Sequence, residues 1–151
     1  MNRKLFFLLC VPLLLTGCFR EKYGTTHYCF GNKTNKVVHV VSYSHLDSSG
    51  KLVDIEHSFG LAPGEEYEIK DTAMGGFPGP FNRRYVRISD GEREVTFVSR
   101  PDQADQKTYL YDVESYRLVK SKKYERWYRY DFTDRDFEDG IPVTEETEID
   151  Y

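Results

Sequence analysis

Five side chains that could ligate a metal ion lie close together in the sequence, on either side of one Ser-Ser-Gly turn. Zinc requires three or four nitrogen, oxygen or sulfur ligands at about 2.0–2.2 Å. The residues after the turn alternate as in a half-buried strand, which places His57 on the opposite face from Asp54 and Glu56. The sequence therefore predicts no metal site in this set, which comprises His45, Asp47, Asp54, Glu56 and His57.

Motifs of established enzyme classes are missing from the sequence. It contains no His-Glu-x-x-His, Gly-x-Ser-x-Gly or Cys-x-x-Cys sequence and no glycine-rich phosphate loop before a helix. We therefore expect no catalytic residues and no cofactor. The alternative, an enzyme, would require a pocket of convergent, pKa-shifted polar groups, for which His45, Asp54 and His57 are the candidates.

Cys18 is the residue with the most specific chemistry. It follows two basic residues, an apolar run from Leu5 to Leu15, and two small or polar residues, which are the three parts of a secretion signal. The apolar run is shorter than the roughly 20 residues that span a bilayer. The sequence Leu15-Thr16-Gly17-Cys18 resembles the lipobox of bacterial lipoproteins, in which the Cys sulfur is acylated and the Cys becomes the new N-terminus.

The lipobox resemblance implies a signal peptide over residues 1–17 and a lipidated N-terminus and tether over residues 18–25. A diacylglycerol and a third acyl chain would make the membrane a partner. Phe19 stands where Asp tends to retain Gram-negative lipoproteins at the inner membrane, which favours the outer membrane. Some gut bacteria use an acidic cluster here for surface export. The segment Phe19–Lys22 has only one acid, which favours the periplasmic leaflet over the cell surface.

The mature chain is acidic and has one cysteine that is expected to stay a thiol. Loss of residues 1–17 leaves 19 basic against 25 acidic residues, a net charge of −6. Nucleic-acid binding needs a dense cationic face, and the basic clusters here are short, so no nucleic-acid partner is expected. Cys29 lies in a strand-like run and is predicted to be a buried, inert thiol. The alternative is a reactive thiol or one that pairs with another molecule.

Strong turn signals divide the mature chain into short strands. Val37–Tyr43 is apolar on both faces, as a central strand would be, and Asp90-Gly91 predicts a type I′ hairpin. Seven or eight such strands without a long amphipathic helix predict an all-β, antiparallel β-sandwich of immunoglobulin-like or transthyretin-like topology over residues 26–139. Thr133 is expected to cap a short C-terminal helical turn. Residues 140–151 are expected to form an acidic, disordered tail.

Two segments are candidates for binding a partner. One is a loop rich in Gly and Pro whose two aromatic residues either cover the end of the core or contact a partner. The other is a Tyr-rich strand in which the alternation separates Tyr128 from Trp127 and Arg129. Its residue types are enriched at interfaces, but they also form aromatic and cation–π pairs within a sheet. The candidate partner-binding residues are Phe77, Phe81, Trp127, Tyr128 and Arg129.

The order of the turns and strands resembles small uncharacterised β-sandwich lipoproteins of gut bacteria, which end in a Tyr-rich strand and a short acidic segment. The resemblance rests on Asn32–Asn35, Leu61–Glu65, Asp90-Gly91 and Tyr128–Phe137, and it transfers no catalytic residue. The sequence thus predicts a lipid-anchored, non-enzymatic envelope protein that binds a protein or a glycan. The alternatives are a structural spacer or assembly component of an envelope complex and, less favoured, an enzyme or metal-binding protein.

Overall fold

The structure, a computed structural model, describes residues 23–74, 79–81, 84–101 and 106–144. This part of the chain contains nine strands, which form two sheets. Sheet A has the strand order β4-β1-β8-β7, and sheet B has the order β3-β2-β5-β6-β9. The strands are β1 (Tyr23–Asn32), β2 (Val38–Leu46), β3 (Leu52–Leu61), β4 (Glu66–Met74), β5 (Tyr85–Ser89), β6 (Arg93–Val98), β7 (Arg117–Lys122), β8 (Glu125–Phe132) and β9 (Ile141–Pro142). Three 3₁₀ turns are η1 (Tyr109–Tyr111), η2 (Val113–Ser115) and η3 (Asp134–Phe137).

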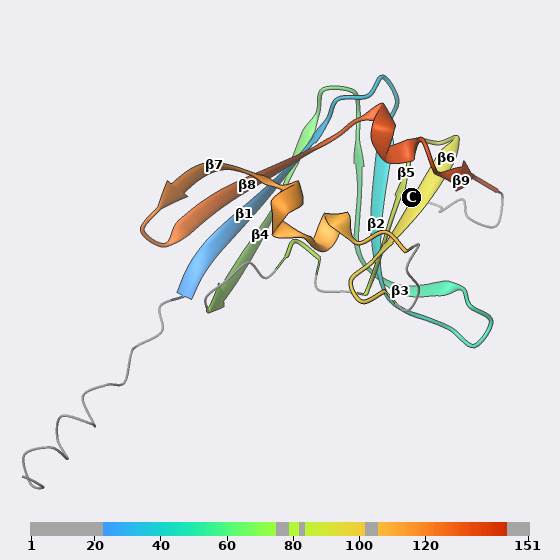
Figure 1. The fold of residues 1–151 in the computed structure, drawn as a ribbon, viewed down its shortest axis with the longest axis horizontal. Helices are drawn as coiled ribbons and strands as arrows, with labels where there is room; N and C mark the ends of the chain where they lie inside the picture. The colour runs from blue at the N-terminus through green and yellow to red at the C-terminus, as the bar shows by residue number, and fades with distance from the viewer. Residues whose placement is uncertain (1–22, 75–78, 82–83, 102–105, 145–151) are drawn as a thin grey trace, which may run out of the picture.

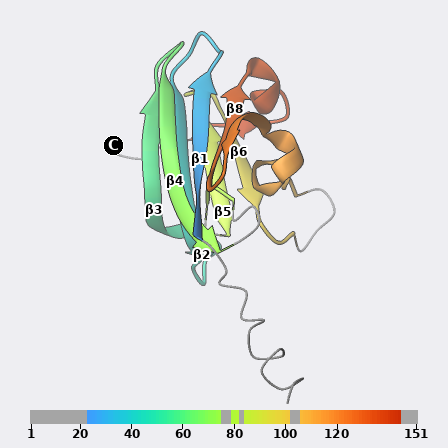
Figure 2. The same ribbon diagram turned by 90° about the vertical axis from the view of Figure 1, so that its left-hand side faces the viewer.

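The expected all-β sandwich is confirmed, because the two sheets pack together as layers (Figures 1 and 2). Every pair of these strands is antiparallel except β1 and β8, which run parallel. In an immunoglobulin constant domain the first two strands share a sheet. Here β1 and β2 lie in different sheets, so the strand order differs from that of a constant domain. The finer assignment, immunoglobulin-like or transthyretin-like, stays a prediction.

Strand β2 is central in sheet B, as its apolar sequence predicts. It pairs with β3 on one side and β5 on the other. Val38 and Val40 belong to the main core between the sheets, whereas Val41 and Tyr43 belong to a smaller cluster with Tyr85 and Val98. Both faces of the strand are therefore buried, which explains why it lacks the alternation of polar and apolar residues.

Strand β3 departs from the expected alternation because it contains a β-bulge. Ser42 of β2 pairs with His57, but the next residue, Tyr43, pairs with Ile55, so β3 carries one extra residue. A bulge of this kind reverses the faces of the residues beyond it. Ile55, expected on the core face with Phe59, is consequently 53 % exposed, while Phe59 is buried.

The hairpin between β5 and β6 forms where Asp90-Gly91 predicts it, but the turn is longer than type I′. Gly91 has a φ of 86°, and Asp90 is not among the residues with positive φ. The side chain of Asp90 accepts hydrogen bonds from the backbone N–H groups of Glu92 and Arg93 at 2.9 and 2.7 Å. These bonds close a wider turn, so positive φ is needed only at the glycine.

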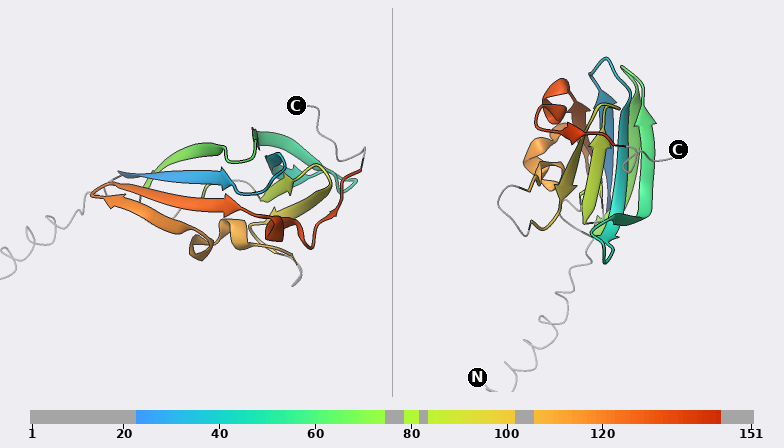
Figure 3. Two further views of the ribbon diagram at one scale, coloured as in Figure 1. Left: turned by 90° about the horizontal axis from the view of Figure 1, so that it is seen from above. Right: turned by 90° about the vertical axis from the view of Figure 1, so that its right-hand side faces the viewer.

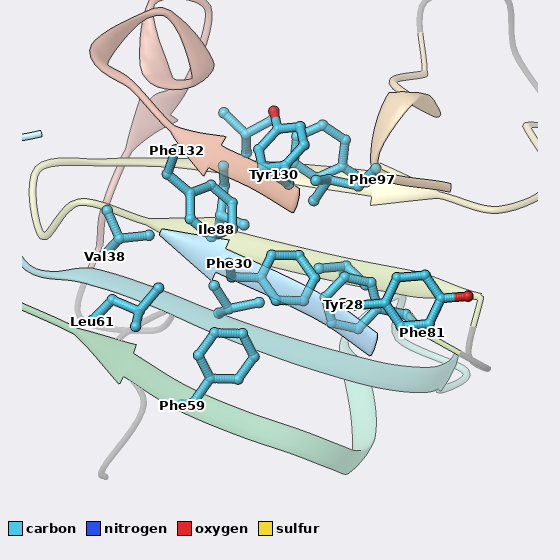
Figure 4. Close-up of a cluster of buried hydrophobic side chains, with 14 of the residues drawn as sticks. Tyr28, Phe30, Val38, Phe59, Leu61, Phe81, Ile88, Phe97, Tyr130 and Phe132 are labelled. Atoms are coloured by element: carbon cyan, nitrogen blue, oxygen red, sulfur yellow. The ribbon is translucent and has the colours of Figure 1, made fainter. Parts of the chain in front are cut away.

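The main core is dominated by aromatic rings from both sheets, with Phe30 of β1 at its centre (Figure 4). The Phe30 ring is fully buried and lies 5.8 Å from Phe59, 5.5 Å from Phe81 and 5.9 Å from Phe132, measured between centroids. The strands of both sheets therefore depend on one side chain for part of their mutual packing.

Both ends of the sandwich extend beyond the expected domain limits. β1 begins at Tyr23, inside the segment 18–25 expected to be a tether, because its first residues pair with the end of β4. Residues 141–142, expected in a disordered tail, pair with β6 as β9. The signal peptide and Cys18 lie outside the described residues, as do residues 145–151.

Asn32 ties the end of β1 to the turn that leads into sheet B. Its side-chain amide donates to the carbonyls of Lys36 and Leu61, and its side-chain oxygen accepts from the N–H and hydroxyl of Thr34. The residue is 1 % exposed. Asn32→Ala is expected to lower the free energy of unfolding by about 2–3 kcal/mol, because these groups lose their partner in a buried place. Urea denaturation measures this loss. The exposed Asn35→Ala should change the value by less than about 0.5 kcal/mol.

Candidate binding surface

Among the described residues, the two partner-binding candidates that remain accessible lie on the outer face of sheet A. Along β8, Tyr128, Tyr130 and Phe132 point into the core, so Trp127 and Arg129 point outward. This separation of the two faces is the one that the sequence predicts. Tyr128 itself is 8 % exposed and packs in the core, so its assignment as a partner-binding residue is corrected.

The aromatic loop residues divide in the same way. Phe81 is 3 % exposed and packs against Phe30 in the core, with ring centroids 5.5 Å apart, so it is not available to a partner. Of the two roles considered for it, covering the core is the one observed, since a sandwich with open ends must close them with loop side chains. Phe77 lies outside the described residues.

The indole ring of Trp127 is held between the two strands that flank β8. On the β1 side it stacks on His27, with ring centroids 4.4 Å apart and an angle of 15° between the planes. On the β7 side, Lys120, its cross-strand neighbour, places its Nζ 4.5 Å from the ring centroid. The ring therefore stacks on one side chain of the same sheet and lies within cation–π distance of another.

His27 connects this stack to β4. Its Nδ1 lies 2.6 Å from Oε1 of Glu68, and its Nε2 lies 3.8 Å from Oε1 of Glu125. The His27 side chain is largely buried, whereas both glutamates are more than one third exposed. The histidine is thus fixed in orientation by a carboxylate on one side and by Trp127 on the other.

Arg129 forms the second half of the surface through ion pairs to two acids. Its guanidinium lies 2.7 Å from Oε1 of Glu66 and 2.8 Å from Oδ1 of Asp131. The hydrogen bond from Arg129 lowers the pKa of Glu66. Gly31 lies directly beneath, and a Cβ there would come within 2.6 Å of the guanidinium. The network therefore depends on a glycine in β1, where a larger residue would push the arginine away.

Cys29 is half-buried on this outer face, not fully buried as predicted. The reason is the strand alternation, which puts Tyr28 and Phe30 in the core and the cysteine between Glu68 and Arg129 of the neighbouring strands. Burial and the Glu68 carboxylate raise the pKa of the thiol. A raised pKa keeps the thiolate fraction small at neutral pH, so the thiol is a poor nucleophile despite its exposure.

The outer surface thus has a continuous set of interlocking residues: Glu66, Glu68, His27, Cys29, Trp127, Arg129 and Lys120. We call this set the sheet A surface. Sequence reasoning finds Trp127 and Arg129 from their residue types. It misses His27, Glu66 and Glu68, because their neighbours come from the parallel β1–β8 pairing and from β4, which no local pattern specifies.

The residues considered for metal binding are not brought together. His45 lies 3.5 Å from Asp54, and Asp47 uses its carboxylate to accept hydrogen bonds from its own turn, at Ser49 and Lys51. Those bonds, above all the one from the Ser49 hydroxyl, lower the pKa of Asp47. Within residues 23–74, 79–81, 84–101 and 106–144, no three His, Cys, Asp or Glu side chains are placed to hold an ion.

A hollow of about 460 Å³ lies beside η3 and is lined in part by Tyr109, Tyr130 and Asp136. Its buried carboxylate, Asp136, accepts hydrogen bonds from the hydroxyls of Tyr109 and Tyr130 and from the N–H and hydroxyl of Thr133. These bonds occupy all of the roughly four acceptor positions of a carboxylate. Asp136 therefore fixes the capped turn that Thr133 predicts, and it has no acceptor position left for a substrate.

Comparison of the chain with protein-family models, with curated proteins and with solved structures gives no match. Among the described residues, no helix has the length and apolar character needed to cross a bilayer.

Proposed function

We propose that this protein is a lipid-anchored, non-enzymatic envelope protein that binds a partner through the sheet A surface. The observation that carries the proposal is the interlocked geometry of Trp127, His27 and Arg129 with the acids of β4. Trp and Arg are the residue types that dominate binding energies at interfaces. Side chains that are already fixed lose little conformational entropy on binding, which increases affinity for a complementary surface.

A protein partner fits this surface better than a glycan. Sugar rings stack on an open aromatic face, and the Trp127 ring already stacks on His27 and has the Lys120 ammonium 4.5 Å from its centroid. What the surface presents instead is an aromatic edge surrounded by charges of both signs, from Glu66 and Glu68 to Arg129. Such a pattern favours a flat protein surface of complementary charge.

The lipid anchor is supported by the sequence around Cys18 and by the short distance along the chain to the first strand, which begins at Tyr23. Multiple acyl chains would hold the sandwich at the outer membrane, in its periplasmic leaflet. Cys18→Ser is expected to abolish incorporation of a labelled fatty acid completely and to leave the precursor uncleaved, 17 residues longer than the mature chain. Gel mobility and fatty-acid labelling in the producing bacterium measure both. Unchanged labelling would contradict the anchor.

The binding surface is tested by photo-crosslinking from two positions that face opposite sides of the sandwich. A photoreactive residue in place of Lys70, which is exposed on β4 beside Glu68, is expected to crosslink a protein in intact cells. The matched control is Thr96, exposed on the outer side of β6 between two core residues. The Lys70 crosslink should be lost when Trp127 is replaced by Leu in a variant that still folds. Equal crosslinks from both positions, or none from either, would favour the structural spacer.

A further inference from the structure

The end of sheet A at which β1 begins carries a distinct group of exposed side chains. Strand β8 runs parallel to β1, so the β7–β8 hairpin turn lies beside the start of β1 (Figure 1). The N–H of Thr25 donates to the carbonyl of Tyr124 in that turn at 2.8 Å. We call this end the anchor-proximal tip and define it by Tyr23, Lys122, Lys123 and Tyr124.

The chain path keeps this tip close to the lipidated residue of the proposed function. Five residues lead from Cys18 to Tyr23. A fully extended chain spans at most about 3.6 Å per residue, so the Cα atom of Tyr23 lies within about 18 Å of the Cα atom of Cys18. The headgroup region on each side of a bilayer is itself about 5–8 Å thick. The tip is therefore the part of the described sandwich that reaches the membrane surface first.

The side chains at the tip are of types that favour contact with lipid headgroups. Tyr23 is 63 % exposed and Tyr124 is 41 % exposed, although each is a large aromatic residue. Lys122 and Lys123 are also exposed, and the Nζ of Lys123 lies 5.5 Å from the Tyr124 ring centroid. Tyrosine is enriched at membrane–water interfaces, and lysine is attracted to anionic lipid. The β7–β8 hairpin projects past the core toward this side (Figure 3).

Acids are present along the whole of sheet A, from Glu66 and Asp131 toward one end to Asp71 and Glu125 toward the other. Glu66 and Asp131 flank Gly31, near the opposite end of β1 from Tyr23, and the acidic turn η3 follows β8 at that far end. At the tip, the nearest acid on β8, Glu125, lies 3.8 Å from Lys122. Asp71 of β4 lies opposite Thr26. The hairpin lysines therefore lie near fewer acidic side chains than the basic residues at the far end of the sheet do, although the whole mature chain is acidic.

We propose that the anchor-proximal tip rests on anionic lipid headgroups of the leaflet that holds the acyl chains. This contact rests on the proposed lipid anchor and adds an orientation to it. Strands β1 and β8 both begin at the tip and run away from it. The sandwich then stands on the hairpin, and the sheet A surface is presented sideways, where a partner in the envelope can reach it.

Amine labelling of the acylated, full-length mature protein in lipid vesicles tests the contact. The protein is reconstituted into phosphatidylcholine vesicles with or without phosphatidylglycerol and reacted briefly with an amine-reactive reagent. Mass spectrometry then gives the labelling of each lysine. Labelling of Lys122 and Lys123 is expected to fall about fivefold or more with phosphatidylglycerol and to recover at high salt. The exposed Lys33 and Lys51 serve as internal controls and should react equally in both vesicles.

A charge variant separates the contact from the anchor. Lys122→Gln together with Lys123→Gln should leave the protein bound to the vesicles. In this variant, the labelling of Lys120, the remaining hairpin lysine, should be the same with and without phosphatidylglycerol. Lys33→Gln is the matched control and should change nothing. Equal labelling of Lys122 in all vesicles, with the protein still bound, would overturn the contact and leave the anchor intact. Acylated protein that remains in the supernatant would overturn both.

Discussion

The protein is expected to unfold cooperatively between about pH 10 and pH 12, because ionisation of its buried tyrosines opposes folding. Burial is the largest cause that raises the pKa of each of these side chains above the ordinary value of 10. At Tyr109 and Tyr130 the Asp136 carboxylate raises the pKa further. The residues are Tyr28, Tyr43, Tyr109, Tyr111, Tyr116 and Tyr130.

The sign and size of this effect follow from proton linkage. Below pH 10 the phenols are protonated in both states, so their contribution to stability is complete. Above pH 10 the unfolded chain loses protons that the folded chain retains, and stability falls as the pH rises. Each retained proton costs about 1.4 kcal/mol per pH unit, so the six together cost up to about 8 kcal/mol per unit. A domain stability of about 5–15 kcal/mol is exhausted within about two units.

Phenolate absorbance and circular dichroism, recorded against pH, measure the alkaline transition. The part of the absorbance change that comes from the six buried tyrosines is expected to coincide with the loss of the folded circular dichroism spectrum. Tyr111→Phe is the sharpest variant, because its buried hydroxyl has no hydrogen-bond partner in the described structure. It should raise the unfolding pH and cost little stability at pH 7. The control Tyr23→Phe removes a hydroxyl that is exposed, and it should leave the midpoint unchanged. Full ionisation of the tyrosines with an unchanged folded spectrum would contradict the prediction.

Phe30→Ala is expected to lower the free energy of unfolding by about 3–5 kcal/mol. The ring is fully buried and contacts rings from both sheets, including Phe59 of β3 and Phe132 of β8. Its removal leaves a cavity at the centre of the sandwich that neither sheet can fill without moving, so the cavity adds to the lost transfer free energy. Urea denaturation should show a lower midpoint with an unchanged slope.

Two further variants keep this core prediction testable. Phe30→Leu preserves more of the volume and should cost less than the alanine, so it serves if Phe30→Ala does not fold. Tyr67→Ala removes a ring that stacks on Phe59 at 4.1 Å but is 41 % exposed. Its expected cost is about 1 kcal/mol, since much of that ring is already in contact with water. A loss below about 2 kcal/mol for Phe30→Ala would contradict its central role.

Most of the fold could be predicted from local sequence patterns. The continuous apolar run in β2 identifies a strand buried on both faces, and the alternation of residues along β8 is enough to separate Tyr128 from Trp127. Thr133 identifies the start of η3. These features are set by neighbours in the chain, so residue types and spacing suffice to predict them.

The errors arise where a distant strand decides the outcome. The bulge in β3 is defined by its register against β2 and reverses the face of Ile55. The extension of β1 to Tyr23 requires β4, and β9 requires β6. Phe81 lies in a loop whose composition is typical of a recognition site, yet its ring is buried at the end of the core. Burial against a remote partner overrides local propensity in each case.

The sequence by itself determined an all-β protein with one residue, Cys18, whose surroundings resemble an acylation site, and two residue types on β8 suited to recognition. Only the tertiary structure decided which residues surround them. The parallel pairing of β1 with β8 stacks His27 on Trp127, brings Gly31 beneath Arg129 and sets the hairpin lysines beside the start of β1. The reason is physical. Pairing between strands about a hundred residues apart is chosen by the burial of the whole core, and no local pattern records it.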